Sequence, residues 1–139
     1  MWLVFSFLSA GFAAAVAIFG KIGLDKVDPT LATTLRSVVM MLFMFFASLS
    51  LGKFKSFSIT DLQGKEWVFI VLAGVAGALS WLFYFLALKD GDATRVSAID
   101  RLSIVFVVLL AALFLSEALT VKSLIGALLI TGGALLIAL

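Results

Sequence analysis

Five apolar stretches, each roughly 20 residues long and separated by short clusters of charged residues, dominate this 139-residue sequence. A helix of about 20 residues crosses about 30 Å of hydrocarbon, because each residue adds about 1.5 Å. Hydrophobic residues make up 64% of the chain and charged residues 13%, which is more apolar side chain than a soluble domain of this length can bury. The sequence therefore predicts an all-α, polytopic integral membrane protein with a single transmembrane domain over residues 1–139.

The five predicted membrane-spanning helices cover approximately residues 2–20, 31–51, 67–88, 96–116 and 123–139. Asp28 and Pro29 are typical of a helix start, because an aspartate accepts hydrogen bonds from free backbone N–H groups and proline lacks only an N–H that is unpaired there. Asp92 is a similar candidate cap for the fourth helix. The first span has no basic segment before it, which favours a retained helix over a signal peptide.

The composition excludes several classes of function. The chain has no cysteine and no histidine, so it cannot form a disulfide, a histidine proton relay or a Cys/His zinc site. No nucleophile–base set, metal-ligand spacing or phosphate-binding glycine loop is present, so we expect neither an enzyme nor a bound cofactor or metal. Most lysines and arginines lie between spans, where they set topology, and the net charge of +2 does not indicate nucleic acid.

The loop charges indicate no preferred orientation in the membrane. The side of the N-terminus carries Lys53, Lys55, Lys65 and Lys122, and the opposite side carries Lys21, Lys26, Lys89 and Arg95. An excess of positive loops normally faces the cytoplasm, but four residues stand on each side unless Arg36 and Arg101 add to the second. Either one loop dominates, or the chain inserts both ways and two opposite copies form an antiparallel homodimer. Transporters are often built from such inverted halves.

Three ionisable residues lie within the predicted spans: Arg36, Asp100 and Arg101. Charges inside a membrane are costly and face protein or water, so each is a candidate for substrate binding or coupling. Counting about 1.5 Å per residue from the span centres places Arg36 about 7.5 Å and Asp100 about 9 Å from the midplane, on the same side. This favours an Arg36–Asp100 ion pair, with Arg101 as the competing partner. Asp100 is either a structural anchor or a group that titrates or contacts substrate.

Polar and aromatic side chains accompany these charges. Ser97, Asp100 and Ser103 are spaced by three and predict one polar stripe on the fourth helix. Trp81 and Tyr84 in the third span could hold a cationic or aromatic substrate by cation–π and stacking contacts. An interfacial aromatic belt is the alternative, and it is stronger for Tyr84, which lies nearer the helix end.

Small residues on the last span indicate an interface. Gly126 and Gly133 are seven positions apart and so lie on nearly one helix face, with Gly132 adjacent. The fifth span is therefore the preferred contact of a dimer.

Four segments of the second half follow a familiar pattern: residues 84–93 (YFLALKDGDA), 99–103 (IDRLS), 114–119 (FLSEAL) and 126–134 (GALLITGGA). They resemble the EamA-like domain of the drug/metabolite transporter superfamily, as does Asp28-Pro29 followed by Arg36. The likeness covers nearly the whole chain. Members of this family usually carry two such domains, ten helices arranged as inverted five-helix halves, and they move small metabolites such as amino acids out of the cell.

The resemblance implies one half of an inverted-repeat transporter that works with an oppositely oriented copy. We expect alternating-access transport of a small organic solute across a lipid bilayer. The expected location is the inner (plasma) membrane of a prokaryotic cell. One alternative is a non-transporting subunit, or half of a heterodimer that needs an oppositely oriented partner. Another is an exporter of cationic compounds like the small multidrug resistance proteins. Gly126 and Gly133 resemble the two glycines, seven positions apart, in the last helix of those proteins. Those relatives carry an essential glutamate in their first helix, where this chain has no acidic residue.

Overall fold

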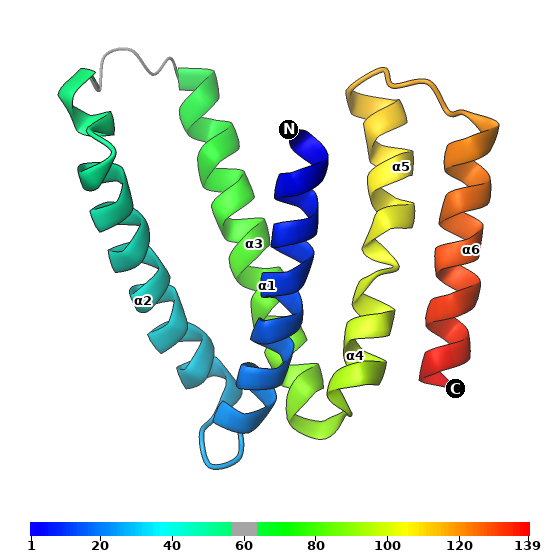
Figure 1. Ribbon diagram of the computed structural model, residues 1–139, viewed down its shortest axis with the longest axis horizontal. Helices are drawn as coiled ribbons and strands as arrows, with labels where there is room; N and C mark the ends of the chain where they lie inside the picture. Colours follow the sequence, from blue (N-terminus) through cyan, green and yellow to red (C-terminus); the bar gives the residue numbers. More distant parts are fainter. Residues whose placement is uncertain (57–63) are drawn as a thin grey trace. The chain divides into compact units, whose positions relative to one another are not determined.

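The computed structural model describes residues 1–56 and 64–139 and is built from helices (Figure 1). In chain order these are α1 (Trp2–Gly23), α2 (Pro29–Ser50), the short 3₁₀ helix η1 (Lys53–Ser56), α3 (Gly64–Asp90), α4 (Ala93–Asp100), α5 (Ser103–Phe114) and α6 (Val121–Ala138). No strand occurs in either described range, which confirms the predicted all-α fold.

Five helical segments are long and apolar enough to cross a membrane, which confirms the predicted number of spans: Trp2–Gly23, Pro29–Ser50, Gly64–Asp90, Ala93–Phe114 and Val121–Ala138. Four of them begin two or three residues before the predicted start, because polar residues form their first turns. At α6, for example, Thr120 and Ser123 bond reciprocally in a capping box before the apolar run begins. The fourth span departs from the prediction of one continuous helix, since it consists of α4 and α5 with a break between them.

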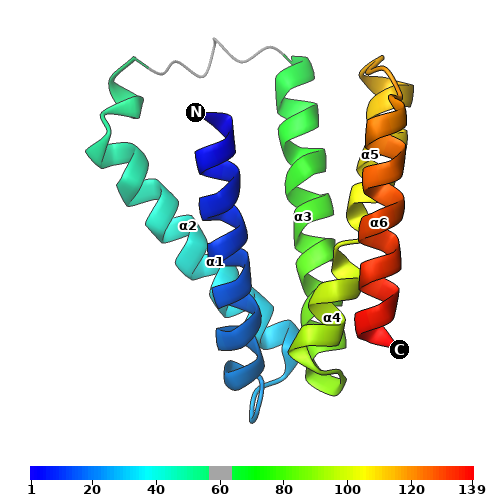
Figure 2. The same cartoon turned by 45° about the vertical axis from the view of Figure 1, so that its right-hand side comes forward.

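The chain divides into two compact units, which are described separately: Met1–Ile22 with Asp90–Leu139, and Gly23–Lys89. In the first unit α6 packs against α4 and α5, and α5 and α6 run antiparallel beside each other (Figures 1 and 2). The buried residues of α6 are Ala127 and Ala134, which are seven positions apart and so share one face. Small side chains on that face let the helices approach closely.

The connection from α5 to α6 is a tight turn. Ser116 follows the end of α5 with a φ of 55°, a left-handed conformation that costs a residue with a side chain more than it costs glycine. The carbonyl of Ala111 accepts hydrogen bonds from the amides of Leu115 at 2.9 Å and Glu117 at 3.3 Å, and these two bonds close the end of α5.

In the second unit α2 and α3 converge at the end where α2 begins and α3 finishes (Figures 1 and 2). The side chains buried there include Leu24, Leu88 and Phe85, which are 2%, 0% and 3% exposed. The ammonium of Lys89 donates to the carbonyl of Leu24 at 2.7 Å. Burial of apolar side chains and this bond together hold the end of α3 against the segment that precedes α2.

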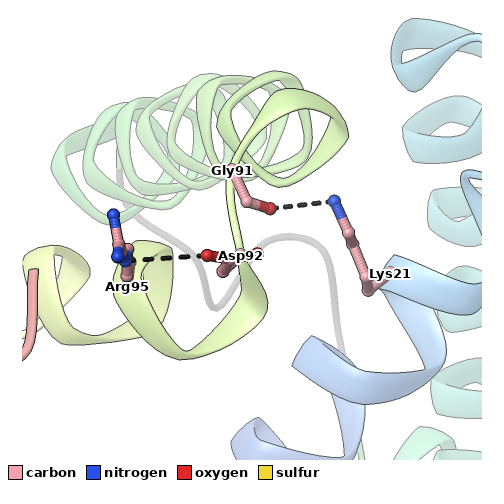
Figure 3. A network of polar contacts seen from close by, with 4 residues as sticks. All are labelled: Lys21, Gly91, Asp92 and Arg95. Carbon is pink, nitrogen blue, oxygen red and sulfur yellow. Dashed lines mark hydrogen bonds and ion pairs between the residues drawn. The ribbon is translucent and has the colours of Figure 1, made fainter.

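Two aspartates precede helices, but they behave differently. The Asp28 carboxylate accepts hydrogen bonds from the amides of Thr30 and Leu31 at 2.9 and 3.1 Å, as predicted for a cap. Asp92 occupies the cap position of α4 but accepts no side-chain capping bond. Its carboxylate instead lies 3.6 Å from Nε of Arg95, as Figure 3 shows.

A lysine connects α1 to the start of α4 in the first unit. Nζ of Lys21 donates to the carbonyl of Gly91 at 2.8 Å (Figure 3). Gly91 immediately precedes the cap residue of α4. A lysine near the C-terminal end of α1 also complements the partial negative charge of that helix end.

Candidate functional site

The structure gathers the predicted site residues in two places, one in each unit. Arg36, Trp81 and Tyr84 lie on α2 and α3 of the second unit. The residues of the first unit follow the broken fourth span: Ser97 and Asp100 on α4, Arg101 in the break, and Ser103 at the start of α5.

Local periodicity explains how Arg36 comes to face α3. Pro29 and Thr33 are the buried residues of α2, and Arg36 lies seven positions after the first and three after the second, on the same face. The hydroxyl of Thr33 donates to the carbonyl of Pro29 at 2.8 Å. The donor of this buried hydroxyl is therefore satisfied within its own helix and needs no acceptor on a neighbouring helix.

The Arg36 guanidinium lies on an aromatic surface formed by α3. Its central carbon, Cζ, is 3.7 Å from the centroid of the Trp81 ring and 5.5 Å from that of Phe85. Both distances lie within the reach of a cation–π contact. Among the described residues of its unit, no carboxylate or carbonyl oxygen forms an ion pair or hydrogen bond with this guanidinium. Arg36 is half-buried and lies about 5 Å from the middle of α2, at about 1.5 Å per residue.

Three aromatic rings of α3 support one another. The centroids of Trp81 and Tyr84 are 5.5 Å apart at an interplanar angle of 77°, and those of Trp81 and Phe85 are 6.1 Å apart at 63°. Edge-to-face pairs of this kind restrict the rotation of the rings. Phe85, which is buried, was not among the predicted site residues. Its position four residues after Trp81 was the signal that the two share a helix face.

The fourth span breaks at Arg101 and Leu102. The amides of Arg101, Leu102, Ile104 and Val105 donate to carbonyls three residues back, at 2.9 to 3.2 Å. Hydrogen bonds from residue i to residue i−3 tighten the backbone into a 3₁₀ turn, a geometry that often marks a hinge within a helix. The predicted stripe of Ser97, Asp100 and Ser103 is therefore divided between α4 and α5, which corrects the expectation of a continuous helix.

Asp100 lies closer to the middle of the fourth span than predicted. The span Ala93–Phe114 is centred between Ser103 and Ile104, so Asp100 and Arg101 lie about 5 and 4 Å from its middle. The difference from the expected 9 Å arises because the helix includes the polar turn that precedes Val96. Charges this deep require protein, water or a ligand as their surroundings.

An open pocket of about 350 Å³ lies beside this break in the first unit. Its lining contains two polar residues of the break and three aliphatic residues of α5 and α6: Arg101, Ser103, Ile104, Val107 and Ile130. Two of the predicted site residues, Arg101 and Ser103, thus line the same pocket. Small-molecule sites commonly combine an apolar wall with a few polar groups in this way.

Asp100 stands apart from this pocket. It is exposed at the end of α4, and it forms no ion pair with a cation among the described residues of its unit. The predicted partner Arg36 belongs to the other unit, and an Arg36–Asp100 pair stays a prediction.

The glycines of α6 make no close approach to any other part of the chain that the structure describes. A Cβ atom added at Gly126, Gly132 or Gly133 would meet nothing within 4 Å. The packed face of α6 is that of Ala127 and Ala134, one position further along the helix. These glycines therefore flank the packed face, and their role in a dimer remains a prediction.

The fold is that of a polytopic integral membrane protein with five helical spans, one of them broken near its middle beside charged residues. The chain matches the EamA-like transporter family over residues 1–139 and belongs to that family. This confirms the resemblance seen in the sequence, and the chain is a membrane transporter whose surroundings are a lipid bilayer.

A relative supports the same assignment. Over 137 residues the chain is 40% identical to a Sinorhizobium protein described as an uncharacterized transporter in the cobO 3′ region. The alignment covers 99% of this chain and 96% of that protein. No solved structure matches the chain.

Proposed function

We propose that this transporter moves a small organic solute by alternating access, as an antiparallel homodimer in a prokaryotic inner membrane. The observation that carries this proposal is the broken fourth span. Transporters bind their solutes near the bilayer midplane, commonly at discontinuous helices. Here the break lies near the middle of the span, and Arg101 and Ser103 line a pocket beside it.

Two further observations support a dimer. The loop lysines and arginines number four on each side, so that neither orientation is favoured. The alignment with the Sinorhizobium relative covers 96% of that protein, which leaves that protein no length for a second, inverted domain. A pathway built from two opposite copies would supply the inverted pair that alternating access commonly uses.

The test is flux through the purified protein alone. The chain is reconstituted into liposomes without any second polypeptide and offered a panel of amino acids, organic acids, polyamines and cationic dyes. We expect saturable uptake of at least one class of solute that depends on Arg101 and Ser103. Absence of flux across the panel contradicts the proposal and favours a non-transporting subunit or a heterodimer that needs an oppositely oriented partner.

A further inference from the structure

The guanidinium of Arg36 is a fixed hydrogen-bond donor with no acceptor among the described residues of its unit. A guanidinium is planar, and its five N–H groups point outward within that plane. Stacking on Trp81 at 3.7 Å uses the face of the group and leaves its edges unoccupied. Among the described residues of the unit, no oxygen receives those N–H groups.

The aromatic rings fix the direction of these donors. Phe85 is buried and lies 5.5 Å from Cζ of Arg36, so the guanidinium is in contact with two rings of one helix. Tyr84 and Phe85 each pack against the Trp81 ring in an edge-to-face arrangement, at centroid distances of 5.5 and 6.1 Å. A long, flexible arginine side chain is thereby held near one orientation before any ligand arrives, which reduces the entropy that binding would otherwise cost.

The same contact argues against a cationic ligand at Trp81. One of the two faces of the Trp81 ring already carries the Arg36 charge. A second positive group would be repelled by that charge in surroundings of low dielectric constant. The chemistry that fits the free edges is an acceptor with two oxygens side by side, because a guanidinium binds a carboxylate through two parallel hydrogen bonds.

We propose that Arg36, held on Trp81, recognises the carboxylate of a small organic acid. The inference rests on the proposed function, because it names the class of solute that the transporter would move. Trp81 acts here as a positioning residue, and Arg36 contacts the ligand.

Binding to this site can be measured separately from transport. The chain contains three tryptophans, so a variant with Trp2→Phe and Trp67→Phe leaves Trp81 as the only indole emitter. Butyrate, succinate and leucine are titrated into the detergent-solubilised protein, each against its amide, in which the carboxylate is neutralised. Tetraethylammonium serves as the cationic probe.

We expect a saturable change in Trp81 emission with the acids and not with their amides or the cation. Arg36→Gln should abolish it, and Arg36→Lys, which keeps the charge but loses the planar fork, should weaken acid binding roughly tenfold. Arg95→Gln is the matched control. It removes the same charge from an exposed residue whose partner, Asp92, is also exposed, and it should leave acid binding unchanged.

Several outcomes would overturn the inference: equal responses to acids and amides, a response to tetraethylammonium alone, or no response of the parent protein to any acid. Acid binding that survives Arg36→Gln does the same. If Arg36→Gln fails to fold, the Arg36→Lys titration decides. If the protein binds acids but shows no flux in liposomes, the proposed function is contradicted and the inference is upheld. If the Arg36→Gln variant transports acids as fast as the parent protein does, the inference is contradicted and the proposed function is upheld.

Asp100 is a second source of a carboxylate, and the titration distinguishes it. If Asp100 occupied the Arg36 fork permanently, Asp100→Asn would free the fork and the acids would bind only in that variant. A parent protein that binds the acids as tightly as Asp100→Asn does supports the free solute as the ligand.

Discussion

Asp100 holds a position that is electrostatically unfavourable within its own helix. It is the last residue of α4, where the helix dipole places partial negative charge, and a carboxylate there is destabilising. Within the described part of its unit no cation pairs with it. Whether Asp100 is an anchor or a working residue stays open between the two predictions, and a substitution can decide between them.

We expect Asp100→Asn to raise stability and lower transport together. Removing the negative charge from the helix end should stabilise the protein by about 0.5 kcal/mol, measured as a rise in the apparent unfolding temperature in detergent. If Asp100 carries the coupled proton, the pH dependence of flux should disappear as well. A variant that is less stable but transports normally would identify Asp100 as an anchor.

At the scale of elements, the starts of α2 and α4 offer a matched comparison. Both follow an aspartate, yet only Asp28 accepts hydrogen bonds from the first turn of its helix. Asp92 pairs with Arg95 instead, and the side chains of that pair are 77% and 60% exposed. Exposed ion pairs contribute little because water competes for both partners.

Asp28→Ala should therefore be the more harmful of two similar changes. Loss of two capping hydrogen bonds should reduce the free energy of unfolding by about 1 kcal/mol, whereas Asp92→Ala should change it by less than about 0.5 kcal/mol. Thermal unfolding of both variants in the same detergent gives the comparison. Equal losses would mean that Asp92 caps α4 after all.

The broken fourth span makes a prediction about local stability. Amides in the 3₁₀ turn, those of Arg101, Leu102, Ile104 and Val105, have poorer hydrogen-bond geometry than α-helical amides. Hydrogen exchange measured by mass spectrometry in detergent should therefore be faster in a peptide over residues 100–105 than in one over 125–135 of α6. Equal protection would argue that the break is rigid and does not act as a hinge.

At the scale of the whole molecule, one copy leaves most of its apolar surface uncovered. No residue of α5 is buried, and α6 buries only Ala127 and Ala134. Lipid can cover such surface, but lipid supplies no partner for charges near the middle of a span. A second copy would enclose those charges and leave the remaining apolar faces to lipid.

Dual topology can be tested by labelling single cysteines, since the chain has none of its own. Lys55→Cys and Lys26→Cys alter exposed residues that lie in successive loops, on opposite sides of the membrane. In intact cells a membrane-impermeant thiol reagent should label part of each population. Labelling restricted to one of the two variants would show a single orientation and contradict the antiparallel homodimer.

If the glycines of α6 form the contact of such a dimer, as the sequence predicts, a larger side chain there should disrupt it. Gly133→Leu adds a side chain where the single chain has open space, so folding of one copy should be unaffected while the dimer dissociates. Cross-linking in membranes measures the loss. Leu136→Ala on the same helix, 83% exposed in the parent, is the control for a change of volume.

The five spans were predictable because hydrocarbon leaves the backbone no alternative to internal hydrogen bonding, so a long apolar run must be a helix. The chemical types of the site residues were predictable for a related reason, since ionisable groups such as Arg36 and Asp100 are conspicuous in such runs. Both inferences depend on how each residue interacts with the solvent around it, and that is written in the sequence.

The break at Arg101 and the cation–π contact of Arg36 with Trp81 could not be predicted in the same way. A run of apolar residues has the same hydropathy whether its hydrogen bonds reach back three residues or four, so hydropathy cannot reveal a 3₁₀ turn. The partner of Arg36 depends on how α2 lies against α3. The guanidinium can contact either the Trp81 ring or a carboxylate, and only the structure shows that it contacts the ring. The sequence by itself determined the solvent, the spans and the charged residues of this protein, and only the tertiary structure decided which of those residues meet, because packing between helices depends on the shapes of both surfaces.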